Sequence, residues 1–166
     1  AKIGLLTKDC RYGLPVAANA LVQTAEEACV QAMQIGYPIV LKGMSRQITH
    51  KTEAGIVKIR VNNNEDVQLQ YHEIEQNARR YNSDAILDGV LVQKMANPGI
   101  ELIIGLKKDA IFGHCLVIGM GGTLVEVLND FALRIMPVNE QDVLEMVQQL
   151  KSKKILEGYR GKDGIN

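Results

Sequence analysis

Lys42 is a residue whose type and position suit ligand chemistry. It ends the short apolar segment Pro38–Lys42 and is followed at once by Gly43. A run of this kind predicts a short buried strand, so the ammonium group would emerge at the edge of a sheet beside a residue without a side chain. That position suits an anionic ligand, although a lysine at the end of a strand is more often only solvated.

A glycine-rich segment, Gly119-Met-Gly-Gly-Thr123, follows the apolar run Cys115–Ile118. Backbone N–H groups at such glycines can cradle a phosphate. The segment is neither a P-loop, which needs Lys-Ser/Thr after its last glycine, nor a dinucleotide fingerprint, which needs a glycine where Leu124 stands. A phosphate site at Gly121 and Gly122 and a turn without a ligand are equally compatible with these residues.

His50 lies in a polar segment, residues 43–55, that has neither helical nor strand periodicity. Such a long loop often carries a function. The carboxylate of Glu53 could orient one ring nitrogen of His50 for proton transfer. The alternative is a solvated histidine without a role, and we interpret the other two histidines, His72 and His114, as structural.

Two groups of polar residues further along the chain have weaker patterns. Gln93, Lys94 and Met95 end an apolar run, and Glu101 follows the turn residues Asn97-Pro-Gly99. They could provide a slot for a nucleotide base and a carboxylate for ribose hydroxyls, or they could form an ordinary hairpin. Glu126 and Asp130 could help to hold a metal, but two carboxylates four residues apart more often form a solvated face.

The pattern of apolar residues predicts the elements that would position these side chains. A helix follows the capping residue Thr24 and ends at Gly36, a second covers residues 64–82, and a third follows Asn139 with Asp142 at its third position. Strands are expected over 38–42, 56–61, 89–95, 100–106 and 115–118, and a short helix over 1–12. The apolar stripe of the second helix would be Val67, Tyr71, Ile74, Ala78 and Tyr81, and that of the third helix Val143, Val147 and Leu150. In the strand over 56–61, Val57, Ile59 and Val61 would alternate with Lys58 and Arg60. This order favours mixed α+β packing over strict βαβ alternation.

The composition excludes several classes of partner. The chain has 166 residues, with 19 Lys and Arg against 19 Asp and Glu, so no net field attracts nucleic acid or anionic lipid. Aromatic residues are only 4%, which argues against a base-stacking platform. Three distant cysteines form no disulfide framework, and no apolar run has membrane-spanning length. We therefore expect a cytoplasmic protein that binds small molecules or proteins.

Six ordered motifs together resemble the ATP-grasp domain of ADP-forming acyl-CoA synthetases, the relatives of succinyl-CoA synthetase. They are Tyr12-Gly-Leu-Pro-Val16, Ile35-Gly-Tyr-Pro-Ile-Val-Leu-Lys42, Ile48-Thr-His-Lys-Thr-Glu-Ala-Gly55, Gly89-Val-Leu-Val-Gln-Lys-Met-Ala96, Gly119-Met-Gly-Gly-Thr-Leu-Val-Glu126 and Leu156-Glu-Gly-Tyr-Arg-Gly161. The resemblance implies an α+β ATP-grasp fold for residues 1–166, made of two small lobes with mixed or antiparallel sheets. The first lobe would cover about residues 14–88 and the second about 89–166.

The resemblance also implies an activity and roles for residues. The family reaction is acid + CoA + ATP ⇌ acyl-CoA + ADP + phosphate, in which histidines carry the phosphoryl group. By similarity, Lys42 would contact the phosphate and adenine edge of the nucleotide, residues 93–95 would form the adenine hinge and Glu101 would hold the ribose. His50 would be the mobile phosphate carrier, since a neutral imidazole is a good nucleophile towards phosphorus.

The same resemblance implies ATP or ADP and Mg²⁺ as ligands, and a CoA-binding subunit or fused domain, CoA and a small carboxylic acid as partners. The chain stops at Asn166, before the segments that resemble the family's Mg²⁺ ligands, so we expect a fragment of a larger synthetase that is inactive alone. Two alternatives remain open. One is a non-catalytic ATP-grasp module of a protein acetyltransferase or regulatory enzyme, and the other is a carboxylate–amine ligase, which needs no histidine relay.

Overall fold

The chain divides into two compact units, Ala1–Asn97 and Pro98–Asn166. The structure is a computed structural model that describes residues 15–122 and 129–158. The helix expected over residues 1–12, as well as Thr123 and Glu126, lies outside the described residues. Among the described residues, the structure contains no helix that is long and apolar enough to cross a membrane.

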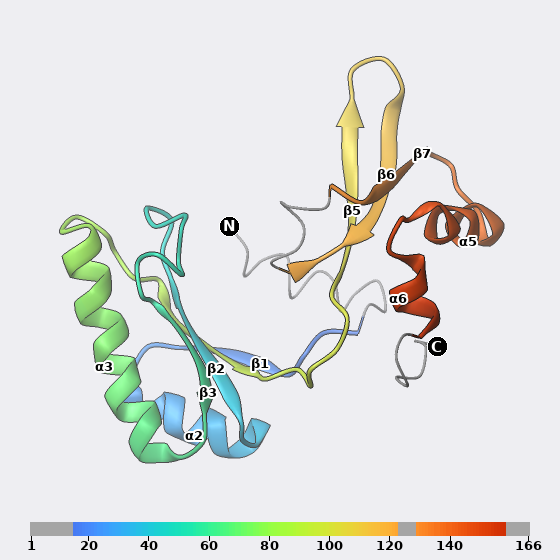
Figure 1. The fold of residues 1–166 in the computed structure, drawn as a ribbon. Coiled ribbons are helices and arrows are strands. Elements are labelled where there is room, and N and C mark those ends of the chain that lie inside the picture. Colours follow the sequence, from blue (N-terminus) through green and yellow to red (C-terminus); the bar gives the residue numbers. More distant parts are fainter. Residues whose placement is uncertain (1–14, 123–128, 159–166) are drawn as a thin grey trace. The chain divides into compact units, whose positions relative to one another are not determined.

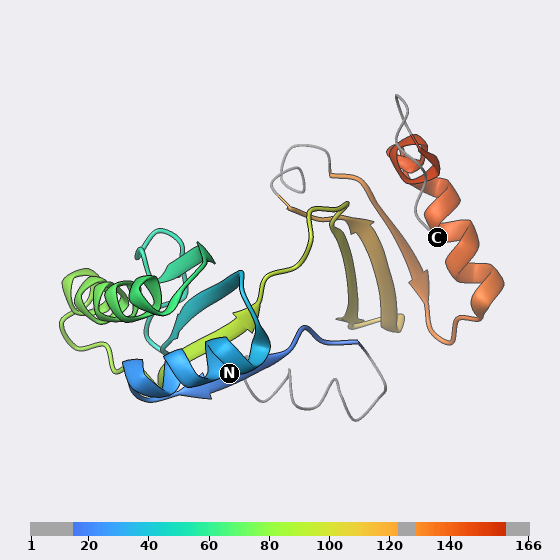
Figure 2. The same ribbon diagram turned by 90° about the horizontal axis from the view of Figure 1, so that it is seen from below.

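The first unit is an antiparallel sheet with two helices on one face (Figures 1 and 2). Its elements are β1 (Asn19–Val22), α2 (Ala25–Ile35), β2 (Ile39–Met44), β3 (Val57–Val61), α3 (Asn64–Tyr81) and β4 (Gly89–Lys94). The strand order is β1-β4-β2-β3, so β4 lies inside the sheet although it comes last in the sequence. Within residues 15–97, no helix covers the opposite face of the sheet, which we call the helix-free face.

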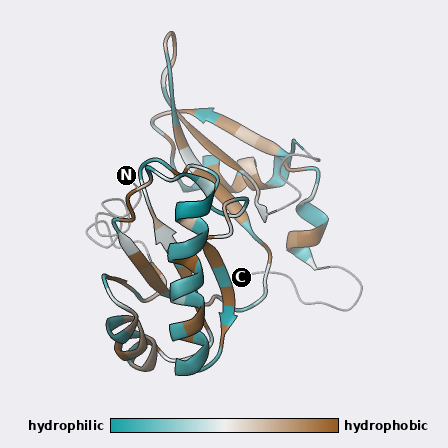
Figure 3. Ribbon diagram, turned by 90° about the vertical axis from the view of Figure 1, so that its left-hand side faces the viewer, coloured by the Kyte–Doolittle hydropathy of each residue, from teal (hydrophilic) through white to brown (hydrophobic). Residues whose placement is uncertain are grey.

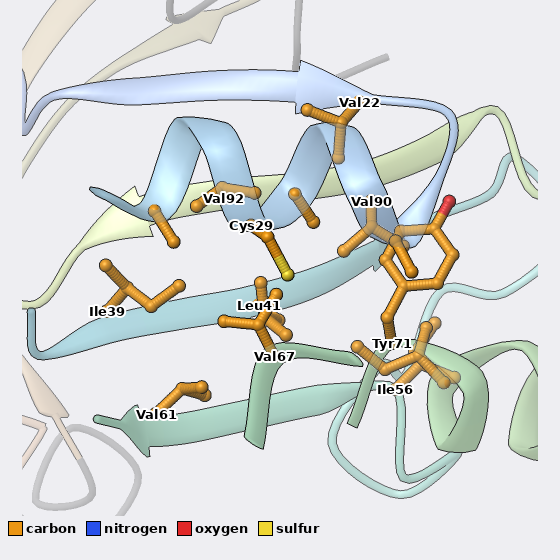
Figure 4. Packing of buried hydrophobic residues seen from close by; sticks show 14 of the residues in the cluster. Val22, Cys29, Ile39, Leu41, Ile56, Val61, Val67, Tyr71, Val90 and Val92 are labelled. Atoms are coloured by element: carbon orange, nitrogen blue, oxygen red, sulfur yellow. The ribbon is translucent and has the colours of Figure 1, made fainter. Parts of the chain in front are cut away.

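A single apolar cluster holds the first unit together (Figure 4). Ile39 and Leu41 of β2 are fully buried against Val67 and Ile74 of α3. The expected helical stripe is confirmed for Val67, Tyr71, Ile74 and Ala78, but Tyr81 is half exposed at the end of the helix. The side of α3 that faces the viewer in Figure 3 is mainly hydrophilic, as an amphipathic helix requires.

The helix boundaries follow from the predicted caps. Thr24 accepts a hydrogen bond from the Glu27 N–H at the start of α2, and α2 ends at Gly36 with φ of 82°. In the second unit Asn139 and Asp142 form a reciprocal capping box. These caps satisfy N–H groups that the first turn leaves without helical partners.

Strand β3 differs from its predicted alternation. Val57 pairs with Lys42, whereas Val61 pairs with Ile39, and the register shifts between these pairs. Arg60 has φ of 58° within this irregularity. The extra residue of the β-bulge turns Val57 and Val61 to opposite faces, so the simple alternation of Val57, Ile59 and Val61 was wrong.

The second unit is a three-stranded antiparallel sheet packed on helix α5. Its elements are β5 (Leu102–Asp109), β6 (Gly113–Met120), β7 (Phe131–Ile135), α5 (Glu140–Gln149) and α6 (Lys153–Glu157). The strand order is β5-β6-β7, and α5 contacts β6 and β7. Met146 of α5 is fully buried in the apolar cluster of this unit. Of the predicted stripe, Leu150 is buried in the same cluster, and Val143 and Val147 are partly buried against it.

The boundary between the units falls after Asn97, instead of the expected position near residue 88. The physical reason is that β4 is hydrogen-bonded to both β1 and β2 of the first sheet. β4 and β5 therefore do not form the hairpin considered above, and Asn97-Pro-Gly99 connects two sheets. Strands β1 and β7 were not predicted, since each is short and lacks a clear alternation.

Candidate functional site

Lys42 and Gln93 lie together on the helix-free face of the first sheet. Val40 pairs with Gln93, and Lys42 lies two residues further along β2, so all three side chains point to the same face. The Lys42 Nζ donates a hydrogen bond to the Gln93 Oε1 over 2.7 Å. The sequence predicted both residues for one site, and the structure brings them into contact.

This contact fixes the orientation of the Gln93 amide. An ammonium group can only donate, so the Gln93 oxygen must face Lys42 and the Nε2 group must face away. Asn19 of β1 pairs with Gln93 and adds a third polar side chain to the same face. Asn19 was missed because β1 itself was not predicted.

The Lys94 side chain lies on the other face of the sheet. Lys94 pairs with Ile39, which is fully buried beneath the helices. Its Nζ donates to the carbonyl oxygens of Gly36, over 2.8 Å, and Tyr37, over 2.9 Å. The structure therefore separates the Lys94 side chain from Lys42 and Gln93, with which the sequence had grouped it, because neighbouring residues of a strand alternate between faces.

The backbone N–H groups at the end of β4 have protein partners. The Lys94 N–H donates to the Ala18 carbonyl over 2.8 Å, and the Met95 N–H donates to the Pro38 carbonyl over 3.2 Å. A hinge formed by these residues would therefore have to contact a ligand through other backbone groups or through Gln93.

In the second unit, Glu101 lies against Gly121 and Gly122. The Gly121 N–H donates to the Glu101 carbonyl over 2.6 Å, and a Cβ atom on Gly121 would lie 2.9 Å from the Glu101 carbonyl carbon. A Cβ on Gly122, whose φ is 69°, would lie 3.2 Å from the Glu101 carboxylate oxygen. Packing is therefore one reason for glycine at both positions, because the missing side chain lets the chain pass close to Glu101. The predicted ligand role would be a second reason.

His50 is exposed on its loop. Its side chain is 67% exposed, and the Nδ1 atom lies 3.5 Å from the Glu53 Oε1. The Ala54 N–H donates to the His50 carbonyl over 3.0 Å, which closes one helical turn around the pair. The predicted proximity of His50 and Glu53 is therefore present.

The loop around His50 is anchored at both ends. Ile48, Ala54 and Ile56 are buried in the core of the first unit. The Asn77 side chain of α3 also donates to the Gly55 carbonyl over 3.0 Å. The loop thus presents His50 from a turn fixed by apolar side chains. One of these buried side chains, Ile56, belongs to the residue that follows Gly55.

The Asp130 side chain is buried and hydrogen-bonded within the second unit. It is 7% exposed, and its carboxylate accepts hydrogen bonds from the Lys151 N–H and the Ser152 N–H, each over 2.8 Å, and from the Ser152 hydroxyl. Burial alone would raise the pKa of Asp130, but these hydrogen bonds together lower it. The carboxylate therefore fixes the turn before α6. These hydrogen bonds favour a structural role for Asp130 over a role as a metal ligand.

Among residues 15–122 and 129–158, no group of three or more His, Cys, Asp or Glu side chains could hold a metal ion. We assign no Mg²⁺ ligand among these residues. His72 forms a pair with Glu75 on the exposed surface of α3, with the Nδ1 atom 3.1 Å from the Glu75 Oε2.

Comparison with known proteins defines the class. Residues 10–166 match the family model of the ATP-grasp domain, so the chain belongs to this family. The beta subunit of acetate–CoA ligase [ADP-forming] II from Pyrococcus furiosus is 43% identical over 152 residues, which make up 92% of this chain and 64% of that subunit. The chain thus spans about two-thirds of that relative's length.

Solved structures agree with this assignment. A dinucleotide forming acetyl-coenzyme A synthetase 1 from Ca. Korarchaeum cryptofilum, in complex with coenzyme A and Ca-AMPCP, has a TM-score of 0.91 and 36% identity over 100% of this chain and 80% of that chain. In another structure of that enzyme, with Mg-AMPPCP, a phosphohistidine segment points towards the nucleotide binding site; its TM-score is 0.78 and its identity 34%, over 100% of this chain and 78% of that chain. The predicted family and α+β ATP-grasp fold are confirmed. The chain fits the nucleotide-binding portion of an ADP-forming acyl-CoA synthetase.

Proposed function

We propose that this chain binds ADP and ATP as the nucleotide-binding portion of an ADP-forming acid–CoA ligase. The observation that carries the proposal is the contact between Lys42 and Gln93 on the helix-free face of the first sheet. This contact places the Lys42 ammonium group beside the Gln93 amide and fixes the direction in which the amide N–H groups point. These groups suit the phosphate and the base of one nucleotide.

We propose that Glu101 of the second unit contacts a ribose. A carboxylate accepts hydrogen bonds from paired hydroxyl groups, and it repels a phosphate that has no counter-ion. The turn at Gly121 and Gly122 lies against this carboxylate. We therefore propose that Gly121 and Gly122 shape the surroundings of this ribose contact, whereas Lys42 contacts phosphate.

His50 is proposed as the phosphoryl carrier. With a proton on Nδ1 facing Glu53, the lone pair of the ring lies on Nε2. Nε2 would attack the γ-phosphorus of ATP, so that an N–P bond forms while the bond to the bridging oxygen of ADP breaks. The exposed position of His50 leaves the ring accessible to such a substrate. The phosphohistidine segment of the Korarchaeum enzyme supports this role.

The whole protein would require further parts. We propose that CoA and a small carboxylic acid bind to a CoA-binding subunit or fused domain, and that acyl-CoA forms only in its presence. Mg²⁺, as seen with the nucleotide analogue in the Korarchaeum enzyme, would neutralise phosphate charge. The described cysteines, Cys29 and Cys115, are free thiols, which supports a cytoplasmic location.

Labelling with γ-³²P-ATP tests this function. In the protein combined with its CoA-binding part, an acid-labile, base-stable adduct should form, and His50→Ala should abolish it while ADP binding survives. His72→Ala is a matched control, because His72 is also exposed and also pairs with a glutamate three residues later. Labelling and acyl-CoA formation that persist in His50→Ala would exclude His50 as the carrier.

A further inference from the structure

The C-terminus of α2 receives its positive charge from a neighbouring strand. The last turn of α2 contains no basic residue. The carbonyl groups at a helix C-terminus carry partial negative charge and lack helical partners. The Lys94 Nζ donates to the carbonyl of Gly36, the C-cap residue, over 2.8 Å, and to that of the next residue, Tyr37, over 2.9 Å.

A further contact ties the same two segments together. The Met95 N–H donates to the Pro38 carbonyl over 3.2 Å. The end of β4 is therefore held to residues 36–38 by two side-chain bonds and one backbone bond. Hydrogen bonds from an ammonium group are stronger than neutral ones, so Lys94 is the main part of this tie.

Lys94 lies directly after Gln93, and the two side chains point to opposite faces. A movement of the strand end that releases Lys94 would also move the Gln93 amide, which lies 2.7 Å from Lys42. We propose that Lys94 is a positioning residue: it fixes the end of β4 against the C-terminus of α2, so that Gln93 is held in place for the nucleotide base. This inference rests on the proposed function, and it differs from the direct nucleotide contact that the resemblance implies for Lys94.

Hydrogen exchange tests the tie without any ligand. In Lys94→Met, which keeps the length of the side chain and removes its donors, the Met95 amide should exchange at least about tenfold faster, as a loss of 1.4 kcal/mol in local stability would give. Lys94→Arg should restore most of the protection, because it keeps a cation with several donors. Unchanged exchange of the Met95 amide in Lys94→Met would overturn the proposal.

Two ligands then separate positioning from direct contact. In the full chain, Lys94→Met should weaken ADP binding about tenfold and leave inorganic pyrophosphate binding within about twofold. Lys58→Met is the control, since Lys58 forms an ion pair with Glu73 on α3 and its strand β3 is separated from β4 by β2 in the sheet. If Lys94→Met does not fold, Lys94→Gln, which keeps donors without charge, replaces it and should show a smaller loss of the same kind.

The outcomes distinguish the two proposals. Equal losses for ADP and pyrophosphate would identify Lys94 as a phosphate ligand and overturn its positioning role. An unchanged affinity for ADP would also overturn it, while loss of ADP binding in Lys42→Ala in the same experiment would leave the proposed function intact. Wild-type protein that binds neither ligand would contradict the proposed function and the role of Lys94 with it.

Discussion

Gln93 has a defined amide orientation because its neighbour is a lysine. The ammonium group of Lys42 cannot accept a hydrogen bond, so the Gln93 oxygen faces it over 2.7 Å. The nitrogen of the amide then presents donors alone to a ligand. A site built in this way would recognise acceptor atoms at the edge of a base.

At the scale of residues, the sequence could propose Lys42, Gln93 and Glu101 as candidates by type and order. It could not show that Lys94 serves the other face, since β4 is apolar on both faces and gives no alternation from which to assign the direction of a polar residue. The one available signal was the absence of a basic residue in the last turn of α2, which leaves its carbonyls to a cation from elsewhere.

Asp130 gives a prediction for stability. Asp130→Asn should destabilise the protein by about 2 kcal/mol at pH 7, because it removes the charge from hydrogen bonds to two backbone N–H groups and one hydroxyl. The pKa of Asp130 is lowered in the folded state from its ordinary 3.8. Its contribution is therefore complete above that value and is lost as the pH falls through the lower folded pKa.

Denaturant unfolding at several pH values measures this effect. Wild type and Asp130→Asn should differ at pH 7 and converge as the pH falls below about 4. Asp142→Asn, which alters the capping box of α5 instead, serves as the comparison. A stability difference for Asp130→Asn that is independent of pH would show that the charge of Asp130 is not the cause.

At the scale of elements, the long periodic segments could be predicted and the short ones could not. Helices α2 and α3 have clear caps and apolar stripes, which the structure confirms. Strands β1 and β7, of four and five residues, were missed because neither shows a clear alternation. The sequence predicted β3 as a strand but did not predict its bulge, since no local residue pattern indicates a register shift.

The turn at Gly121 gives a prediction at this scale. Gly121→Ala would place a Cβ atom 2.9 Å from the Glu101 backbone, so Glu101 must move. We expect a loss of about 1 to 3 kcal/mol in stability, as for other overpacked sites, and weaker ADP binding. Calorimetric titration with ADP measures the second effect.

Gly105→Ala is the matched control, because a Cβ at that position in β5 meets no atom within 4 Å. It should leave ADP binding unchanged and keep or slightly increase stability. If Gly121→Ala binds ADP as tightly as Gly105→Ala, the position of Glu101 does not matter for the nucleotide.

At the scale of the whole molecule, the candidate residues come from both units. Lys42 and Gln93 belong to the unit that ends at Asn97, and Glu101, Gly121 and Gly122 belong to the unit that begins at Pro98. The sequence predicted two lobes but placed their boundary too early, because β4 follows a loop and its partners in the sheet are distant in the sequence. Each unit therefore carries candidate residues that can be tested separately.

Calorimetric titration with ADP tests most directly the central claim that this chain binds a nucleotide. Wild-type protein should bind ADP, and Lys42→Ala and Glu101→Gln should each weaken the affinity about tenfold or more, as expected when a charged hydrogen bond to a ligand is lost. Lys58→Ala and Glu145→Gln are the controls, since each removes one partner of an ion pair elsewhere in the same unit, and both should stay within about twofold of wild type. Wild-type affinity in the combined Lys42→Ala and Glu101→Gln variant would contradict the account.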